Sequence, residues 1–385
     1  MTNATKLNSD IQCLRAVAIL AVVLQHAHNT ILPDQYPWVA KFYGAFSGRA
    51  GVDLFFAISG FVIASALLPK IDLCNDLNKK LQETLAFWCK RAWRLFPSAW
   101  LWLVICLIFS LVFNQSQIFG TNQANFSALV AGMFQVANFR FAQIYDQGLF
   151  YGASFVYWSL SLEEQFYLVL PLLVIFARKW LPAILLSLIA IQFAQDRSML
   201  LLVTRTDALL IGVLIALWRR HSTYELFDPE FLRRRRCFGI LVLGFLSLGL
   251  LTATALPLKV LPLPYSLVAM ISGLLVLIAS FDRGYLFGTG LLKALFEWVG
   301  ARSYAMYLIH VPVYFAIREI NFRLHGPDHW QLPGVVAFNT VCALVAIAVV
   351  SELNYRLVEA PLRRRGAQLV KQYRSAKGLS RDEVA

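Results

Sequence analysis

An arginine and a histidine lie eleven residues apart in the apolar stretch "LRAVAILAVVLQHAHN", residues 14–29. Arg15 carries a permanent charge, whereas the imidazole of His26 titrates near neutral pH and can accept a proton from a hydroxyl. Eleven residues are about three turns of helix, so both side chains lie on one face, roughly 16 Å apart along the axis. His28 lies about 200° around the helix from His26, and we expect it to be structural.

Other apolar segments carry ionisable residues that can complete a site around His26. A carboxylate can orient an imidazole and stabilise its protonated form, and a guanidinium can stabilise an oxyanion. Asp53 and Glu163 are the candidate carboxylates, and Arg205 is the candidate cation. Ionisable residues in membrane spans are rare and costly, so together they indicate a polar cavity in the bundle.

A purely structural reading also fits several of these residues. A pair such as Arg205 and Asp207 can serve only to hold helices together, and His310 can be an ordinary hydrogen-bonded helix contact. Glu163 and Glu164 point about 100° apart on a helix, so only one of them can face a small site. The sequence alone leaves these alternatives open.

A basic segment, "FWCKRAWRLFPSAW", forms a second cluster at residues 87–100. Arg91 and Arg94 are three residues apart and share one side of a helix. A guanidinium binds phosphate through two parallel hydrogen bonds, which makes the pair a candidate phosphate site. Charge that orients the chain in the membrane, or contact with anionic lipid, explains the same residues equally well.

The composition indicates a membrane protein that is all helical. Hydrophobic residues make up 58% of the 385 residues, and charged residues only 15%. About ten stretches approach the roughly 20 apolar residues that a membrane span needs. We expect these spans to be helices, because lipid cannot form hydrogen bonds with exposed backbone groups. The expected spans are 11–31, 50–69, 95–113, 155–177, 180–195, 199–218, 237–256, 262–281, 297–318 and 334–357. Residues 126–138 are apolar but too short to span, and we expect an interfacial or re-entrant piece there.

The net charge of +13 follows the topology of these spans. Lys and Arg concentrate after the second, fourth, sixth, eighth and tenth spans, as cytoplasmic loops do, which predicts that both termini are cytoplasmic. This pattern accounts for the arginines at 233–236 without a nucleic-acid partner. The six cysteines show no metal-binding spacing, so we expect free thiols, no disulfide and no metal site.

Seven motifs in order resemble the acyltransferase-3 family of integral-membrane O-acyltransferases. The motifs are Arg15 with His26, "GVDLFFAISGF" (51–61), Arg91-x-x-Arg94-x-x-Pro97, "WSLSLEEQFY" (158–167), "RTDALLIG" (205–212), "SYAMYLIHVP" (303–312) and "YRLVEAPLRR" (355–364). The resemblance covers about residues 8–365. We therefore expect a transmembrane domain at residues 1–365 and a short, basic, mobile cytoplasmic tail at 366–385.

This resemblance implies a multi-pass enzyme of the bacterial inner membrane. It implies transfer of an acyl group, usually acetyl, from cytoplasmic acyl-CoA to a sugar hydroxyl of an extracytoplasmic polysaccharide, lipopolysaccharide or other glycan. His26 matches the essential histidine of the family and Arg15 its motif partner, while Arg91 and Arg94 match an arginine pair tied to donor binding. Some relatives carry a further hydrolase-like domain, so the expectation here is that the membrane domain acts alone.

Two alternatives remain at this stage. Within the family, the acceptor can be a small molecule such as a macrolide. In a different class, buried carboxylates and histidines can form the proton relay of a secondary transporter. Transporters usually contain repeated halves, and the sequence has no matching halves.

The expected topology is tested by reporter fusions at four positions. Reporters near residues 75 and 230 are expected to give a cytoplasmic signal, and those near 120 and 325 an extracytoplasmic one, because Lys and Arg concentrate in the first pair of loops. Alkaline phosphatase and fluorescent protein fusions in the host membrane measure this. An extracytoplasmic signal at 75 or 230 would contradict the depth assigned to every candidate residue.

Overall fold

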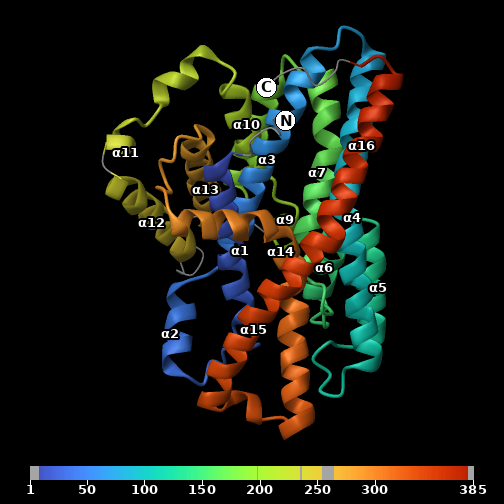
Figure 1. Ribbon diagram of the computed structural model, residues 1–385, viewed down its shortest axis with the longest axis vertical. Helices are drawn as coiled ribbons and strands as arrows, with labels where there is room; N and C mark the ends of the chain where they lie inside the picture. The colour runs from blue at the N-terminus through green and yellow to red at the C-terminus, as the bar shows by residue number, and fades with distance from the viewer. Residues whose placement is uncertain (1–7, 197, 235, 254–263, 380–385) are drawn as a thin grey trace.

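A computed structural model describes residues 8–196, 198–234, 236–253 and 264–379, and its regular elements there are helical (Figure 1). The first half contains α1 (Ser9–Ala27), α2 (Pro37–Ala45), α3 (Ala50–Asp72), α4 (Leu77–Val112), α5 (Asn122–Met133), α6 (Ala137–Asp146), α7 (Tyr157–Phe176) and α8 (Leu181–Ala194). The second half contains α9 (Met199–Val203), α10 (Asp207–Trp218), η1 (Ser222–Phe227), α11 (Phe231–Arg234), α12 (Arg236–Ala253), α13 (Pro264–Ser280), α14 (Leu291–His325), η2 (His329–Gln331), α15 (Pro333–Asn354), the π-helical turn η3 (Tyr355–Glu359) and α16 (Ala360–Ala376).

The helices confirm an all-helical chain with membrane-spanning character. Six helical segments within the described residues are long and apolar enough to cross a membrane, namely Ser9–Ala27, Pro37–Asp72, Leu77–Val112, Tyr157–Phe176, Met199–Trp218 and Pro333–Ala376. Three shorter apolar helices, Leu181–Ala194, Phe238–Ala253 and Tyr265–Ser280, lie where further spans are expected. The count of ten spans and the cytoplasmic location of the termini remain predictions.

Two segments differ from a simple chain of spans. The apolar stretch 126–138 falls on α5 and α6, two short helices separated by a turn in which Gln135 has a φ of 57°. At the other end of the chain, the expected mobile tail begins as helix, because α16 continues to Ala376 and packs along α4. Residues 380–385 of that tail lie outside the described residues.

Helices α1 and α14 pack side by side through the centre of the bundle (Figure 1). Arg15 contacts Ser303, and His26, eleven residues later, contacts His310. The contacts advance in the same direction along both helices, so α1 and α14 run parallel. This orientation agrees with the expectation that the first and ninth spans both run outward, and it lets one helix pair hold groups at two depths.

Helices α3 and α10 approach each other closely at two glycines. A Cβ atom at Gly60 would lie 2.0 Å from the carbonyl oxygen of Leu209, and one at Gly212 would lie 2.1 Å from that of Ala57. Both distances are far inside van der Waals contact, so only glycine permits this packing. Small residues bring membrane helices together in this way, since apolar burial gives little driving force in lipid.

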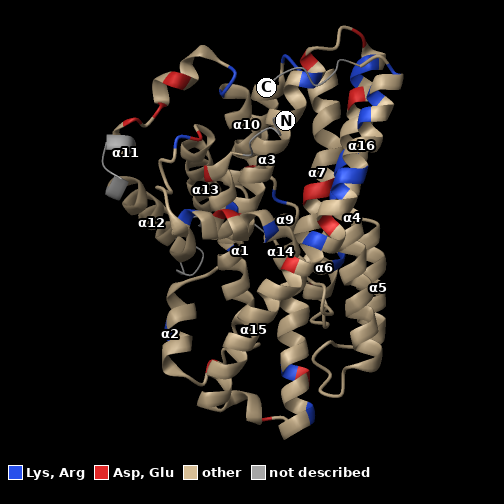
Figure 2. Ribbon diagram, in the orientation of Figure 1, with Lys and Arg blue, Asp and Glu red and all other residues tan. Residues whose placement is uncertain are grey.

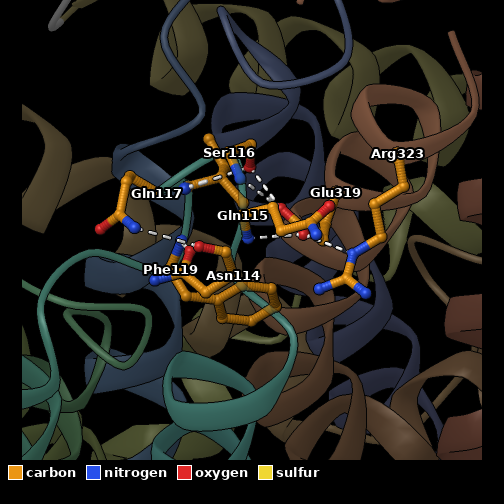
Figure 3. A network of polar contacts seen from close by, with 8 residues as sticks. Asn114, Gln115, Ser116, Gln117, Phe119, Glu319 and Arg323 are labelled. Carbon is orange, nitrogen blue, oxygen red and sulfur yellow. Dashed lines mark hydrogen bonds and ion pairs between the residues drawn. The ribbon is translucent and has the colours of Figure 1, made fainter. Parts of the chain in front are cut away.

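A loop between α4 and α5 is held against α14 by the carboxylate of Glu319 (Figure 3). The backbone N–H groups of Gln115 and Ser116 donate to it over 2.7 and 2.9 Å, the Ser116 hydroxyl donates over 2.5 Å, and Arg323 Nε donates over 2.7 Å. Glu319 lies just beyond the expected span 297–318 and is fully buried. Burial by itself raises the pKa of Glu319, but the hydrogen bonds from Ser116, Arg323 and Gln115 outweigh it and lower this pKa.

Glu319→Gln is expected to destabilise the fold by about 1–3 kcal/mol, because it removes charge-assisted hydrogen bonds at a buried site. The pKa of Glu319 is lower in the folded state than in the unfolded chain, so its stabilisation is present above the unfolded value of about 4.3 and is lost as pH falls through the folded value. Thermal melting in detergent at neutral and acid pH measures both effects. The exposed carboxylate of Asp328 provides the control Asp328→Asn, and equal melting of the two variants would contradict the role of Glu319.

Candidate active site

Arg15 and His26 lie on the same face of α1, which confirms the prediction from their spacing. Arg15 Nε donates to the hydroxyl of Ser303 over 3.2 Å, and His26 Nδ1 lies 2.8 Å from Nε2 of His310. Both partners belong to α14, so this single neighbouring helix receives both side chains. His310 is therefore more than an ordinary helix contact, because it is the hydrogen-bond partner of the candidate base.

The hydrogen bonds of His310 determine the tautomers of both imidazoles. His310 Nδ1 lies 3.0 Å from the carbonyl oxygen of Met306, which can only accept, so Nδ1 of neutral His310 carries the proton. His310 Nε2 is then the acceptor, and His26 Nδ1 must be the donor across the 2.8 Å contact. A neutral His26 consequently has its free lone pair on Nε2, the nitrogen that is suited to accept a proton.

The surroundings of His26 differ from the expected histidine–carboxylate pair. Its ring packs edge-on against Phe155 at 5.1 Å and stacks on His310 at 5.0 Å. Neither Asp53 nor Glu163 is hydrogen bonded to it in the described structure. The expectation that one of these carboxylates orients His26 is corrected: His310 occupies that position. His26 is partly accessible whereas His310 is fully buried, so His26 is the member of the pair that a substrate can reach.

Asp53 and Arg205 form a buried ion pair instead. Arg205 Nε and Nη2 donate to the two carboxylate oxygens of Asp53, each over 2.7 Å, and Nη1 donates to the carbonyl of Leu202 over 2.7 Å. This ion pair joins α3 to the segment before α10, so Arg205 holds helices together, which is the structural alternative that the sequence left open. All three nitrogen atoms of Arg205 are engaged with protein groups, which argues against the oxyanion-stabilising role expected of it.

Glu163 belongs to a chain of polar contacts that leads to the basic cluster on α4. Glu163 accepts a hydrogen bond from the hydroxyl of Tyr167, and that hydroxyl accepts one from Arg91 Nη2 over 2.5 Å. The Arg91 guanidinium also lies over the Tyr167 ring, 4.1 Å from its centroid. Glu163 lines the cavity described next, and Glu164 is not among its lining residues.

A cavity of about 80 Å³ lies among α1, α3, α4, α7 and α14, and we call it the inner cavity. Its wall contains three cations from two helices, Arg15, Arg91 and Arg94, together with Glu163 and a mostly apolar remainder. Tyr307 also lines it, and the Tyr307 ring lies 5.8 Å from that of His310. The inner cavity thus extends from the arginine cluster to a residue that contacts the histidine pair.

Two tyrosines of this site were not predicted from the sequence. Tyr167 follows Glu163 by four residues in "WSLSLEEQFY", and Tyr307 precedes His310 by three residues in "SYAMYLIHVP". Helical spacing of three or four residues places each tyrosine beside its ionisable neighbour, and this spacing is the sequence feature from which their proximity could be predicted. Whether a tyrosine points into a cavity depends on helix packing, which that spacing does not contain.

His28 has the structural role that its angle on the helix predicted. Its Nε2 lies 2.6 Å from Asp34 Oδ1 and its ring stacks on Tyr43 at 4.0 Å, which holds the loop after α1. The hydrogen bond from His28, followed by the one from Asn29, lowers the pKa of Asp34. His28 therefore offers a control histidine close to His26 in sequence and separate from it in space.

No metal site is evident in the described part of the chain. Among those residues, no group of three His, Cys, Asp or Glu side chains is placed to hold a metal ion. The pairs and the inner cavity described above instead present bases and cations, which suit proton transfer and anion binding.

Comparison with known proteins identifies the family of this chain. A family model described as an acyltransferase domain matches residues 8–352. The chain belongs to the acyltransferase-3 family. It is 26% identical over 391 residues to the peptidoglycan O-acetyltransferase OatA of Listeria monocytogenes, covering 93% of this chain and 56% of that protein.

Two further relatives show the same extent of similarity. The putative peptidoglycan O-acetyltransferase YrhL of Bacillus subtilis is 27% identical, with 92% of this chain and 54% of that protein covered. The O-acetyltransferase OatA of Staphylococcus aureus is 24% identical, with 92% and 57% covered. The chain thus spans little more than half the length of these curated relatives. No solved structure matches the chain significantly.

Asp53→Asn is expected to lower the free energy of unfolding by about 3–5 kcal/mol, because it leaves the buried Arg205 guanidinium without its counter-charge. Asp72→Asn, at the other end of α3, weakens two partly exposed ion pairs, with Arg178 and Arg220, and is expected to cost about 0–1 kcal/mol for each. Melting of the purified variants in detergent measures the difference. A fully stable but inactive Asp53→Asn protein would instead indicate that Asp53 takes part in the reaction.

Proposed function

We propose that the protein is a membrane O-acetyltransferase that moves an acetyl group from cytoplasmic acetyl-CoA to a hydroxyl of an extracytoplasmic glycan, with His26 as the general base. The observation that carries this proposal is the placement of α1. One face of that helix presents Arg15 to the cation-lined inner cavity and His26 to the His310 imidazole. A single helix, α1, therefore contributes both a cation for binding an anionic donor and the imidazole that accepts a proton.

In the proposed reaction, His26 Nε2 removes the proton of the acceptor hydroxyl as the hydroxyl oxygen attacks the thioester carbonyl. The new C–O bond forms, the C–S bond breaks, and the proton on His26 passes to the departing sulfur to give the free thiol of CoA. No other reactant is needed, because an alcohol and a thioester give an ester and a thiol. A positioned base of this kind contributes about 10²–10⁴ in rate.

His310 acts as a positioning residue in this mechanism. It accepts the Nδ1 proton of His26 and so keeps Nε2 of His26 unprotonated and fixed in direction. When His26 takes up a proton, the contact becomes a charge-assisted hydrogen bond, which is stronger than a neutral one. His310 thereby supplies the orienting role that a carboxylate has in a catalytic triad, without placing a second charge in the apolar bundle.

The donor and acceptor approach from opposite ends of this arrangement. The inner cavity is narrow and mostly apolar beyond Arg91 and Arg94, which suits the pantetheine arm of acyl-CoA, while the arginines suit its phosphates. The named activity of the relatives supports a peptidoglycan-like glycan as acceptor. The apolar helices support a multi-pass location, for which we propose the bacterial inner membrane. Phospholipid surrounds the apolar helices, and no nucleic acid is involved.

The proposal is tested with purified protein, isotopically labelled acetyl-CoA and a chitooligosaccharide as the acceptor. His26→Ala is expected to reduce acetyl transfer by about 10²–10⁴ while leaving acetyl-CoA binding unchanged, because it removes the base and no donor contact. The rate of the parent protein is expected to fall at acid pH, since a protonated imidazole cannot accept the hydroxyl proton. Mass spectrometry of the oligosaccharide measures the product.

Three variants separate the roles of the histidines. His28→Ala is expected to retain transfer activity at equal membrane abundance, because His28 contacts Asp34 and Tyr43 and is separate from the His26–His310 pair. His310→Leu is expected to lower the maximal rate without changing the KM for acetyl-CoA, and His310→Gln to restore part of it, because its amide oxygen can accept the His26 proton. If His26→Ala is as active as His28→Ala, the base lies elsewhere and the proposal is wrong.

A further inference from the structure

A second cavity of about 250 Å³ adjoins the inner cavity, and we call it the basic vestibule. It lies between α3, α4 and α16 and shares Arg91 and Arg94 with the inner cavity. Figure 2 shows Lys and Arg residues gathered along α16 and the adjacent part of α4. Except for Arg363, the wall contributed by α16 comes from residues 366–385, the segment expected to be a mobile tail, and no function has yet been assigned to it.

Helix α16 is fixed to α4 by two contacts. Arg374 donates to Glu83 over 2.8 Å, and both side chains are buried. At Gly366, a Cβ atom would lie 2.3 Å from Cβ of Trp93, so the two helices touch there without room for a side chain. These contacts orient the helix so that Arg363 and Lys371, two turns apart, both line the basic vestibule.

The cations of the basic vestibule outnumber their acidic partners. Glu83 is paired with Arg374. Arg363 has a 3.9 Å ion pair with Glu359 and a 3.4 Å contact with the Tyr355 hydroxyl, and its guanidinium lies 5.7 Å from the centroid of the Tyr355 ring. Lys371 is exposed and forms no hydrogen bond or ion pair with another described residue. Like charges gathered in a concave site favour an anion, and several phosphates suit several cations best.

The shared arginines point to the same ligand chemistry. Arg94 makes no hydrogen bond or ion pair with any described residue although it lines both cavities. The Nε atom of Arg91 is buried and has no hydrogen-bond partner among the described residues. Buried donors without acceptors are rare in folded proteins, because each costs free energy. An anionic ligand at this junction would satisfy them.

We propose that the basic vestibule binds the phosphorylated nucleotide end of acyl-CoA, and that Arg363 and Lys371 of α16 are phosphate ligands opposite Arg94. This inference rests on the proposed acyl-CoA donor and adds a second wall to its site. Helix α16 is then part of the donor site, and the Arg374–Glu83 ion pair positions it. The same phosphate chemistry is offered by anionic lipid headgroups, which the experiment below separates from the nucleotide.

The test is the Kd for CoA and for dephospho-CoA, which lacks the 3′-phosphate, measured with purified protein in a neutral detergent. Arg363→Gln and Lys371→Gln are each expected to raise the Kd for CoA about tenfold, the loss typical of one charge-assisted contact. At least one of them is expected to lose the preference of the parent protein for CoA over dephospho-CoA. Arg365→Gln removes the same charge from an exposed residue of α16 outside the vestibule and is expected to change the Kd less than about twofold.

The outcomes distinguish this inference from the function on which it rests. Parent protein that binds CoA, together with Arg363→Gln and Lys371→Gln variants that match Arg365→Gln, would overturn the vestibule assignment and leave the donor intact. Parent protein that binds neither form of CoA would overturn the proposed donor itself. If the two variants weaken CoA binding only in vesicles containing phosphatidylglycerol, the cations bind lipid phosphate and the inference is wrong. Equal melting temperatures of the three variants would show that α16 remains docked through Arg374 and Glu83.

Discussion

Polar groups inside this bundle need partners on neighbouring helices, because lipid hydrocarbon supplies none. Three pairs of buried side chains meet that requirement with a partner far away in the sequence. Arg205 pairs with Asp53, Arg374 with Glu83, and His26 with His310. These contacts join α3 to the segment before α10, α16 to α4, and α1 to α14. The cost of an unpaired buried group is what makes each of these alignments specific.

The three pairs have different consequences for function. The Asp53–Arg205 and Glu83–Arg374 pairs neutralise their own charges and leave little free for a substrate. The His26–His310 pair, in its neutral form, leaves Nε2 of His26 without a hydrogen-bond partner among the described residues, which is the condition for accepting a proton. The two ion pairs, in which the charges of both partners are neutralised, therefore stabilise the packing of the helices. The histidine pair leaves one lone pair in a fixed direction, so it can take part in a reaction.

The two cavities give the proposed reaction a direction through the membrane domain. The basic vestibule and the inner cavity share Arg91 and Arg94, and the inner cavity ends at Tyr307, next to His310. A donor with an anionic head and a narrow, uncharged arm fits this arrangement. Its head would lie in the basic vestibule, its arm would extend through the inner cavity, and its reactive end would lie near His26. An acceptor that approaches His26 from the opposite side would meet the thioester without passing the arginines.

The sequence by itself determined the helical class, the family and the shared face of Arg15 and His26, because each depends on composition or on spacing within one helix. Only the tertiary structure decided the partners: His310 rather than a carboxylate for His26, Asp53 for Arg205, and Tyr167 between Glu163 and Arg91. It also turned the start of an expected mobile tail into a wall of the basic vestibule. The physical reason is that helical periodicity fixes the angle of a side chain on its own helix, whereas its partner depends on how neighbouring helices are rotated and aligned, and packing alone sets that.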